Sequence, residues 1–276
     1  MSYILSKEDF EKIKEFIYRK SGIYLEEDKH YRKLNSYIDK RGGVLGFDSF
    51  KDYFYKLRFD DFEGEEFQAL MNFITVNETY FYREKDQFEA LESHILPELD
   101  GLVPQNRPIR ILSSPCSTGE EAYSIVLHVL KEGAVYKKRD IEIVGIDIDS
   151  NVIKKAKKGI FSQRSVEAIP NDTLTKWFEK RDDCYHISDD LIKMVDFKVV
   201  NVFDKVKMME LGKFDIIFSR NMLIYFDDAS RKEVAMTFYD MLTKEGCILL
   251  GHAENMNRIV SVFNSTKVKQ TVMYKK

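Results

Sequence analysis

The stretch IRILSSPCSTGEE, at positions 109–121, decides how the main part of this chain folds. Its first four residues form a short apolar run that predicts a buried strand, and a helical pattern begins at about Glu120. The loop between them is rich in small residues, as a loop must be if a ligand is to approach its backbone. A strand, such a loop and a helix form the first unit of a doubly wound α/β sheet, in which ligands bind at the carboxyl ends of the strands.

The same alternation continues to the end of the chain. Apolar runs at 141–146, 214–218 and 247–250 predict three more strands with helical patterns between them, and 262–263 with 271–274 predict a closing hairpin. We therefore expect residues 109–276 to form an α/β domain with a Rossmann-like, doubly wound sheet. The stretch at about 161–200 interrupts the alternation and contains Pro170, so we interpret it as an insertion within this domain.

The first hundred residues show a different pattern of apolar residues. Apolar residues recur at helical spacing from Phe10 to Ile17, and again within 31–38, 50–57, 67–74 and 88–96, where Pro97 is expected to end the last helix. This pattern predicts a small all-helical domain over 1–76. Residues 77–108 are expected to form a junction and connecting helix, with Pro104 and Pro108 marking the boundary with the α/β domain.

Composition restricts the class of protein. The chain has 276 residues, of which 44% are apolar and 32% charged, so it can bury a core and is not intrinsically disordered. Its net charge of −3 lacks the basic footprint of a nucleic-acid-binding protein, and no apolar run reaches the roughly 18–20 residues of a membrane span. The three cysteines are far apart, and the N-terminus lacks a signal-peptide pattern. We therefore expect a cytoplasmic protein without disulfides or a CxxC metal site.

Acidic residues follow the first two predicted strands. Glu120 and Glu121 begin the helix after the first strand, and Asp147 follows the second. Two acids at a helix N-terminus would repel a phosphate and attract a cation, although they could simply stabilise the helix dipole. An acid in the position of Asp147 typically binds a ribose diol, although a solvated loop acid is the simpler interpretation. Together they favour S-adenosylmethionine, and the lack of a GxGxxG loop argues against a nicotinamide-dependent oxidoreductase.

Three further motifs extend this pattern. They are NETYFYR at 77–83, SRNMLIYF at 219–226 and GHAEN at 251–255. With the CSTGEE loop and the GIDID strand end, in this order, the chain resembles the CheR family of chemoreceptor glutamate methyltransferases over nearly its whole length. The resemblance implies methyl transfer from S-adenosylmethionine to glutamate side chains of chemoreceptors in bacterial chemotaxis, giving glutamate methyl esters and S-adenosylhomocysteine. It also implies that no metal takes part, that the insertion is a small β-subdomain, and that the N-terminal domain is helical.

The resemblance assigns roles to individual residues. Those that it places at the cofactor are Asn77, Thr79, Arg83, Glu121, Asp147, Asn201, Val202, Asn221 and Met222. Glu120 stays an alternative to its neighbour Glu121. Arg83 and Tyr225 are the predicted catalytic residues, because a guanidinium can orient a carboxylate through two hydrogen bonds and a tyrosine can position the same oxygen. Without the resemblance, an ion-paired arginine and a core tyrosine would be the simpler interpretations.

Two further stretches concern the acceptor. Residues 29–41 carry five lysines and arginines and one acidic residue, and the five cations are Lys29, Arg32, Lys33, Lys40 and Arg41. This stretch is either a solvated helix face or a docking surface for the glutamate-rich helices of a chemoreceptor. Some family members bind a receptor's C-terminal peptide by β-augmentation and carry a Gly-x-Gly loop there. The matching stretch here, EKRDDC at 179–184, has no glycine, so we expect no such tether.

Two alternative functions stay open from the sequence. One is a methyltransferase of the same fold with another acceptor, although a nucleic-acid acceptor is disfavoured by the acidic net charge. The other is a catalytically silent protein that binds the cofactor and acts as a signalling partner. A turnover assay distinguishes this silent protein from an enzyme, because only the enzyme transfers methyl groups.

Overall fold

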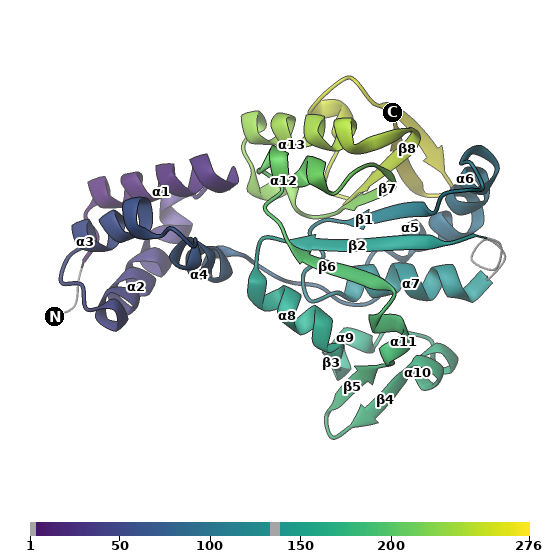
Figure 1. Ribbon diagram of the computed structural model, residues 1–276, viewed down its shortest axis with the longest axis horizontal. Helices are drawn as coiled ribbons and strands as arrows, with labels where there is room; N and C mark the ends of the chain where they lie inside the picture. Colours follow the sequence, from purple (N-terminus) through teal and green to yellow (C-terminus); the bar gives the residue numbers. More distant parts are fainter. Residues whose placement is uncertain (1–3, 133–138) are drawn as a thin grey trace.

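The computed structural model describes residues 4–132 and 139–276. Residues 1–3 and 133–138 lie outside the described residues. Residues 1–3 belong to the predicted N-terminal domain and to the N-terminus that is expected to lack a signal peptide. Figure 1 shows a helical lobe, drawn in purple and blue, beside a larger lobe built on a sheet. The two lobes correspond to the helical pattern and the alternating strand–helix pattern of the sequence.

The helical lobe contains four of the described helices and a π-helical turn, η1 (Lys56–Asp60). The helices are α1 (Lys7–Ser21), α2 (Glu27–Leu45), α3 (Phe50–Tyr55) and α4 (Glu65–Ile74). Helix α1 begins where the Ser6 hydroxyl accepts a hydrogen bond from the Asp9 N–H, and it ends at Gly22, whose φ of 72° is left-handed. Buried residues at helical spacing, among them Phe10 and Ile13, form the core of this lobe.

The connecting segment between the lobes is more helical than predicted. Helix α5 (Lys85–Ala90), the π-helical turn η2 (Leu91–Ile95) and α6 (Leu96–Leu102) follow one another without a break, so the expectation that Pro97 ends the helix was wrong. Pro97 lies in the first turn of α6, where the helix does not need the backbone N–H that proline lacks. A π-helical turn directly before it changes the hydrogen-bond register at this point.

A seven-stranded sheet forms the centre of the larger lobe, in the order β6-β2-β1-β7-β8-β10-β9. The strands are β1 (Ile109–Ser113), β2 (Ile141–Asp147), β6 (Val195–Val199), β7 (Phe214–Ser219), β8 (Leu242–Leu250), β9 (Asn264–Val268) and β10 (Thr271–Lys275). From β6 to β8 the strands run parallel, and β10 and β9 form an antiparallel hairpin at the other edge. This topology confirms the predicted doubly wound α/β fold.

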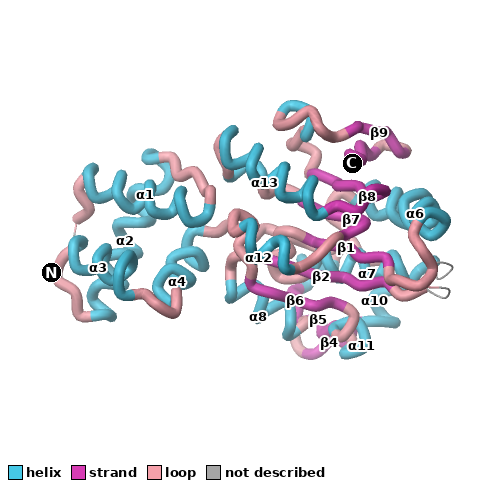
Figure 2. Tube along the Cα trace, turned by 45° about the horizontal axis from the view of Figure 1, so that its top comes forward, coloured by secondary structure: helices cyan, strands magenta, loops and turns pink. Residues whose placement is uncertain are grey.

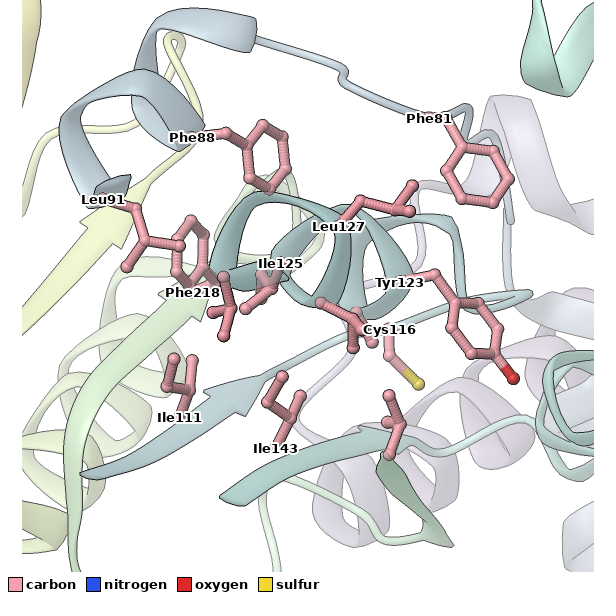
Figure 3. Packing of buried hydrophobic residues seen from close by; sticks show 14 of the residues in the cluster. Phe81, Phe88, Leu91, Ile111, Cys116, Tyr123, Ile125, Leu127, Ile143 and Phe218 are labelled. Carbon is pink, nitrogen blue, oxygen red and sulfur yellow. The ribbon is translucent and has the colours of Figure 1, made fainter. Parts of the chain in front are cut away.

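Helices cover both faces of the sheet. Figures 1 and 2 show α7 (Glu120–Glu132) and α8 (Ser150–Lys158) on one side, and α12 (Lys205–Glu210) and α13 (Asp228–Met241) on the other. Figure 3 shows how the first face packs: Ile111 and Phe218 from the sheet meet Ile125 of α7, and Cys116 is buried in the same cluster, beside Tyr123. Among the residues that the structure describes, no helix is long and apolar enough to cross a membrane.

A small three-stranded sheet lies beside the main one, in the order β3-β5-β4. Its elements are β3 (Ile160–Ser162), α9 (Gln163–Val166), α10 (Asn171–Trp177), β4 (Phe178–Arg181), β5 (Cys184–Ile187) and α11 (Asp189–Ile192). The tight turn between β4 and β5 places Asp182 at a left-handed φ of 51°. The predicted insertion at 161–200 therefore includes one strand, β6, that belongs to the main sheet instead, because β6 pairs with β2.

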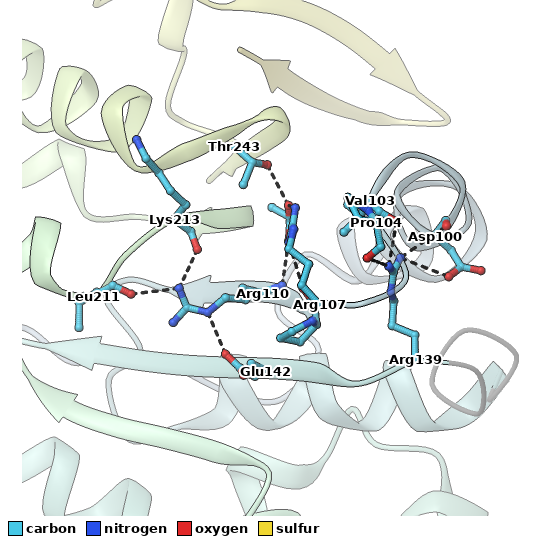
Figure 4. A network of polar contacts seen from close by, with 12 residues as sticks. Asp100, Val103, Pro104, Arg107, Arg110, Arg139, Glu142, Leu211, Lys213 and Thr243 are labelled. Atoms are coloured by element: carbon cyan, nitrogen blue, oxygen red, sulfur yellow. Dashed lines mark hydrogen bonds and ion pairs between the residues drawn. The ribbon is translucent and has the colours of Figure 1, made fainter.

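Arginines hold the amino-terminal ends of the strands, at the edge opposite the loops described below (Figure 4). Arg107 donates two hydrogen bonds, both of 2.8 Å, to the fully buried carboxylate of Asp215 at the start of β7. The Arg110 N–H and the Thr243 hydroxyl donate to the same carboxylate. Burial by itself would raise the pKa of Asp215, but these hydrogen bonds outweigh it and lower the pKa.

The exchange Arg107→Ala should lower the free energy of unfolding by about 2 kcal/mol, because it leaves the Asp215 charge buried without its main partner. We expect a smaller loss of stability than for a wholly buried ion pair, since the Arg107 side chain is 36% exposed and water can replace some of its hydrogen bonds to Asp215. Urea denaturation of both proteins measures the difference. Arg19→Ala is the control: it removes an exposed pair with Glu15, and equal losses for the two variants would contradict the prediction.

Candidate active site

Two adjoining cavities lie where the carboxyl ends of β1, β2 and β7 meet. Their volumes are about 320 Å³ and about 240 Å³. Six residues line both of them, namely Val76, Asn77, Pro115, Asp147, Ile224 and Tyr225. Connections leave the sheet in opposite directions beside β1, and in open α/β sheets this is the place where ligands bind.

The carboxylate of Asp147, at the end of β2, lines both cavities. It accepts hydrogen bonds of 2.9 Å from the backbone N–H groups of Ser117 and Asp149. Burial raises the pKa of Asp147 to about 6, although these hydrogen bonds favour the charged form. The end of β2 and the loop after β1 thus meet at the Asp147 carboxylate. This is the residue that the sequence predicts to bind a ribose.

The neighbouring acids Glu120 and Glu121 point to different places. Glu121 lines the smaller cavity, where it accepts hydrogen bonds from the Ser113 hydroxyl (2.7 Å) and from Arg220 (3.1 Å). Burial raises the pKa of Glu121, and the charge of Arg220 opposes this shift. Glu120 instead accepts hydrogen bonds from the hydroxyls of Thr118 and Ser165, beside the small sheet. The geometry therefore favours Glu121 over Glu120 as a group that faces a ligand.

The junction between the lobes passes over both cavities. Asn77 lines both, and its amide donates to the second oxygen of Asp149 (2.9 Å), whose first oxygen caps helix α8. Thr79 and Arg83 line the smaller cavity. The Arg83 guanidinium donates to the Glu78 carbonyl (2.9 Å) and lies 5.9 Å from the centre of the Tyr80 ring. Only the Nη1 nitrogen of the guanidinium makes this hydrogen bond, and a guanidinium has five N–H donors, so donors are left for a ligand.

The loop after β7 supplies the opposite wall. The carboxylate of Glu254 accepts hydrogen bonds from the N–H groups of Asn221 (2.8 Å), Leu223 (2.7 Å) and Gly251 (2.9 Å), and this supports Asn221 at its left-handed φ of 57°. Asn221 lines the smaller cavity and Met222 the larger one. Tyr225 lines both and is 39% exposed.

Arg83 lies close enough to the Tyr225 hydroxyl for its charge to act on that group. Partial burial raises the pKa of the Tyr225 hydroxyl, and the positive charge of Arg83 counteracts this shift. Both side chains line the smaller cavity. The structure thus brings the two predicted catalytic residues together although 141 residues lie between them in the sequence.

Asn201 and Val202 line the larger cavity together with part of the helical lobe. The Asn201 side chain donates to the Lys20 carbonyl (2.7 Å) and accepts from the Phe203 N–H (3.0 Å), so its polar atoms serve the fold. Residues from the end of α1, the α1–α2 connection and the first turn of α2 form the facing wall; they are Ser21, Ile23, Tyr24, Leu25, Glu26, Lys29 and His30. The helical lobe is therefore part of this cavity.

Sequence reasoning missed two parts of the site. One is the wall from the helical lobe, for which the sequence held no signal. The other is Arg220, which is buried, contacts Glu121 and Glu84, and also donates to the Arg83 carbonyl. The signal for Arg220 was present, because it directly follows β7 and the same strand-end rule had singled out Asp147.

These residues suit a ligand with a sugar and a positively charged end. The carboxylates of Asp147, which is buried, and Glu121, which is 11% exposed, can accept hydroxyl and ammonium hydrogens, and apolar side chains such as Ile146 and Val202 can contact a ring. The Ser117 hydroxyl lines the smaller cavity and has no hydrogen-bond partner within 4–132 and 139–276. In the same residues, no group of three or more histidines, cysteines, aspartates or glutamates is arranged to hold a metal ion.

Comparison with known proteins identifies both lobes. Residues 8–75 match the family model "CheR methyltransferase, all-alpha domain", and residues 77–272 match "CheR methyltransferase, SAM binding domain". The second model alone covers more than half of the chain.

Three similar proteins match this chain over most of their own length. The chain is 41% identical to chemotaxis protein methyltransferase 2 of Vibrio cholerae, covering 99% of this chain and 94% of that protein. It is 32% identical to the chemotaxis protein methyltransferase of Borreliella burgdorferi (91% and 89% covered) and 30% identical to that of Salmonella typhimurium (94% and 88% covered). The chain thus belongs to the CheR methyltransferase family and is an S-adenosylmethionine-dependent methyltransferase.

Proposed function

We propose that the two cavities hold S-adenosylmethionine, with the nucleoside in the larger and the methionine end in the smaller. The observation that carries this assignment is the Asp147 carboxylate, which reaches both cavities and can accept the ribose hydroxyls. Val202 and Met222 would contact the adenine side, and Glu121 would accept from the ammonium group. Asn77, Thr79, Arg83 and Asn221 complete the walls.

The reaction that fits these residues is esterification of a glutamate side chain. When bound, S-adenosylmethionine supplies a methyl group on a cationic sulfur; the new O–C bond forms as the S–C bond breaks, and its electron pair goes to sulfur, giving S-adenosylhomocysteine. A glutamate with a pKa of about 4.3 is ionised at neutral pH, so no general base is needed. Arg83 and Tyr225 would orient the carboxylate, and orientation can contribute roughly 7–11 kcal/mol toward such a barrier.

We infer that the acceptors are glutamates of chemoreceptors, since the similar proteins are named chemotaxis protein methyltransferases. The test is transfer of labelled methyl from S-adenosylmethionine to chemoreceptor cytoplasmic fragments, followed by release of methanol in mild base. Base-labile label supports a glutamate methyl ester. Label that resists base indicates another acceptor group, and cofactor binding without any transfer indicates a silent signalling partner. We place the reaction in the cytoplasm, in keeping with the composition of the chain.

Helix α2 provides the proposed docking surface for an acidic acceptor helix. Arg32, Lys33 and Lys40 are exposed, and Lys29 forms an ion pair of 2.8 Å with Glu26. Arg41 differs from the other four, because it pairs at 2.7 Å with the buried Glu66 of α4. We therefore assign docking to the first four cations and a structural role to Arg41.

Removing the C-terminal tail of a receptor should leave its methylation rate unchanged to within about twofold, since tether binding would require a fitted loop beside β4 and β5. The turn there is short and lacks glycine, with Asp182 in the left-handed region. Initial rates on one receptor fragment with and without its tail measure this. A KM that rises tenfold or more without the tail would show that the tether exists.

Cofactor binding should weaken by about tenfold for each pH unit below 6, because protonation of Asp147 removes an acceptor for the ribose. The effect on stability has the opposite sign. The folded pKa of Asp147 is raised above its unfolded value of about 3.9, so this group stabilises the ligand-free fold as the pH falls from 6 toward 4. Calorimetric titrations and thermal unfolding at pH 5, 6 and 7 separate the two trends. Binding that is constant over this range would contradict the assignment.

A further inference from the structure

The end of α1 contacts two segments of the larger lobe that form the walls of the site. The first segment, 200–204, is a loop after β6, and the second, 220–227, follows β7 and contains one 3-10 helical turn, η3 (Leu223–Tyr225). Neither segment belongs to the strand ladder of the main sheet, so the position of each depends on contacts made by its side chains and backbone groups. The contacts with α1 therefore bear on where the cavity walls lie.

The first contact is between Gly22 and Phe203. The Lys20 carbonyl accepts a hydrogen bond from Asn201 (2.7 Å), which brings the last turn of α1 against the 200–204 loop. A Cβ atom at Gly22 would lie 2.6 Å from the Phe203 ring, closer than any side chain allows. Phe203 directly follows Val202, a residue of the larger cavity. Gly22 is needed here for close approach as well as for its φ of 72°.

The second contact is with the loop that carries Tyr225. The Tyr24 N–H donates to the Tyr225 carbonyl (3.0 Å), and Ile23 forms an antiparallel bridge with Phe226. The Tyr18 hydroxyl donates to Asp227 (2.9 Å), the residue that caps helix α13. Ile23 packs against the cores of both lobes. Backbone pairing and a side-chain hydrogen bond thus hold the chain at Tyr225 and at the two residues that follow it.

We propose that residues 18–24 are a positioning element of the active site, which sets both the Val202–Phe203 wall and Tyr225. The inference rests on the proposed function, because it assigns the effect to cofactor binding and methyl transfer. It gives the helical lobe a second role besides docking. Since the coupling of two binding events is reciprocal, an acceptor that shifts this lobe alters cofactor affinity, and bound cofactor alters acceptor affinity by the same factor.

Gly22→Ala tests the first contact, with Gly46→Ala as its matched control. Both glycines end helices of the same lobe with left-handed φ values of 72° and 75°, so both alanines carry the same backbone strain. A Cβ at Gly46 meets open space, whereas one at Gly22 meets Phe203. We expect both variants to lose thermal stability, but only Gly22→Ala to raise the Kd for S-adenosylmethionine, by about tenfold. Equal Kd values for the two variants would overturn the inference.

A double-mutant cycle with Phe203→Leu covers the case in which Gly22→Ala folds poorly. The smaller leucine leaves room for the new methyl group, so the double variant should recover part of the stability and cofactor affinity lost by Gly22→Ala alone. Strictly additive effects would contradict the contact. Because the stability cycle needs no cofactor, it tests the contact even if the wild-type chain fails to bind S-adenosylmethionine, a result that would overturn the proposed function.

Tyr18→Phe tests the second contact, with Tyr31→Phe as its control. The Tyr18 hydroxyl reaches across to Asp227, whereas the Tyr31 hydroxyl donates to the Leu5 carbonyl within the helical lobe. Loss of one hydrogen bond should lower kcat by about 2- to 10-fold in Tyr18→Phe, with the Kd for the cofactor unchanged. Tyr31→Phe should keep the wild-type kcat. A kcat that is the same in both variants would show that this contact does not position Tyr225.

Discussion

Replacing Arg83 by alanine should lower kcat/KM for the acceptor about 1,000-fold, the largest effect that we expect from a single substitution. Arg83 and Tyr225 line the smaller cavity, and the charge of Arg83 is felt at the Tyr225 hydroxyl. The Glu78 carbonyl and the Tyr80 ring hold the guanidinium in place before any ligand arrives. A preorganised donor needs no rearrangement during the reaction, which is why its loss costs more than that of an ordinary surface cation.

Two further variants make this prediction specific. Arg83→Lys keeps the charge but loses the fork that pairs with both carboxylate oxygens, so its kcat/KM should lie between those of the wild type and Arg83→Ala. Arg58→Ala is the control, because Arg58 lies 5.1 Å from the centre of the Phe59 ring in the helical lobe, much as Arg83 lies over Tyr80. Initial-rate kinetics with labelled cofactor measure all three. A loss below tenfold in Arg83→Ala would remove Arg83 from the catalytic residues.

Replacing Asp147 by asparagine should raise the Kd for S-adenosylmethionine about 100-fold while the fold persists. The two carboxylate oxygens accept from Ser117 N–H and Asp149 N–H. An amide can accept at only one oxygen, so its NH₂ group would face one of these donors and the loop after β1 would shift. The charge that we propose receives the ribose hydroxyls is lost as well, and hydrogen bonds to a charged group are worth about 1.5–3 kcal/mol each.

The pH dependence provides an internal check on Asp147→Asn. Because the asparagine does not titrate, cofactor binding by this variant should weaken less between pH 7 and pH 5 than binding by the wild type, and Glu121 is the group that still titrates in the site. Glu142→Gln is the matched control: Glu142 is an exposed residue of the same strand that pairs with Arg110, and its loss should leave the Kd unchanged. Isothermal titration at three pH values measures both. An unchanged Kd in Asp147→Asn would mean that the ribose lies elsewhere.

Much of the fold was predictable because it follows from local pattern. Buried parallel strands require continuous apolar runs, and the run at 109–112 is one; helices packed on one face require apolar residues at helical spacing, as from Phe10 to Ile17. Pro97 misled the prediction because a proline in the first turn of a helix breaks no hydrogen bond, and local sequence does not show which turn it will occupy. The strand β6 was assigned to the insertion because pairing with β2 is a long-range contact.

The sequence by itself determined the α/β fold, the family, and the strand-end position of Asp147, because these follow from periodicity and from motifs read in order. Only the tertiary structure decided that Glu121, and not Glu120, faces the cavity, since neighbouring helix residues point about 100° apart and packing chooses between them. It also decided that the end of α1 borders the site. The Lys20–Asn201 and Tyr24–Tyr225 contacts join residues far apart in the chain, and such contacts arise only when the lobes pack together.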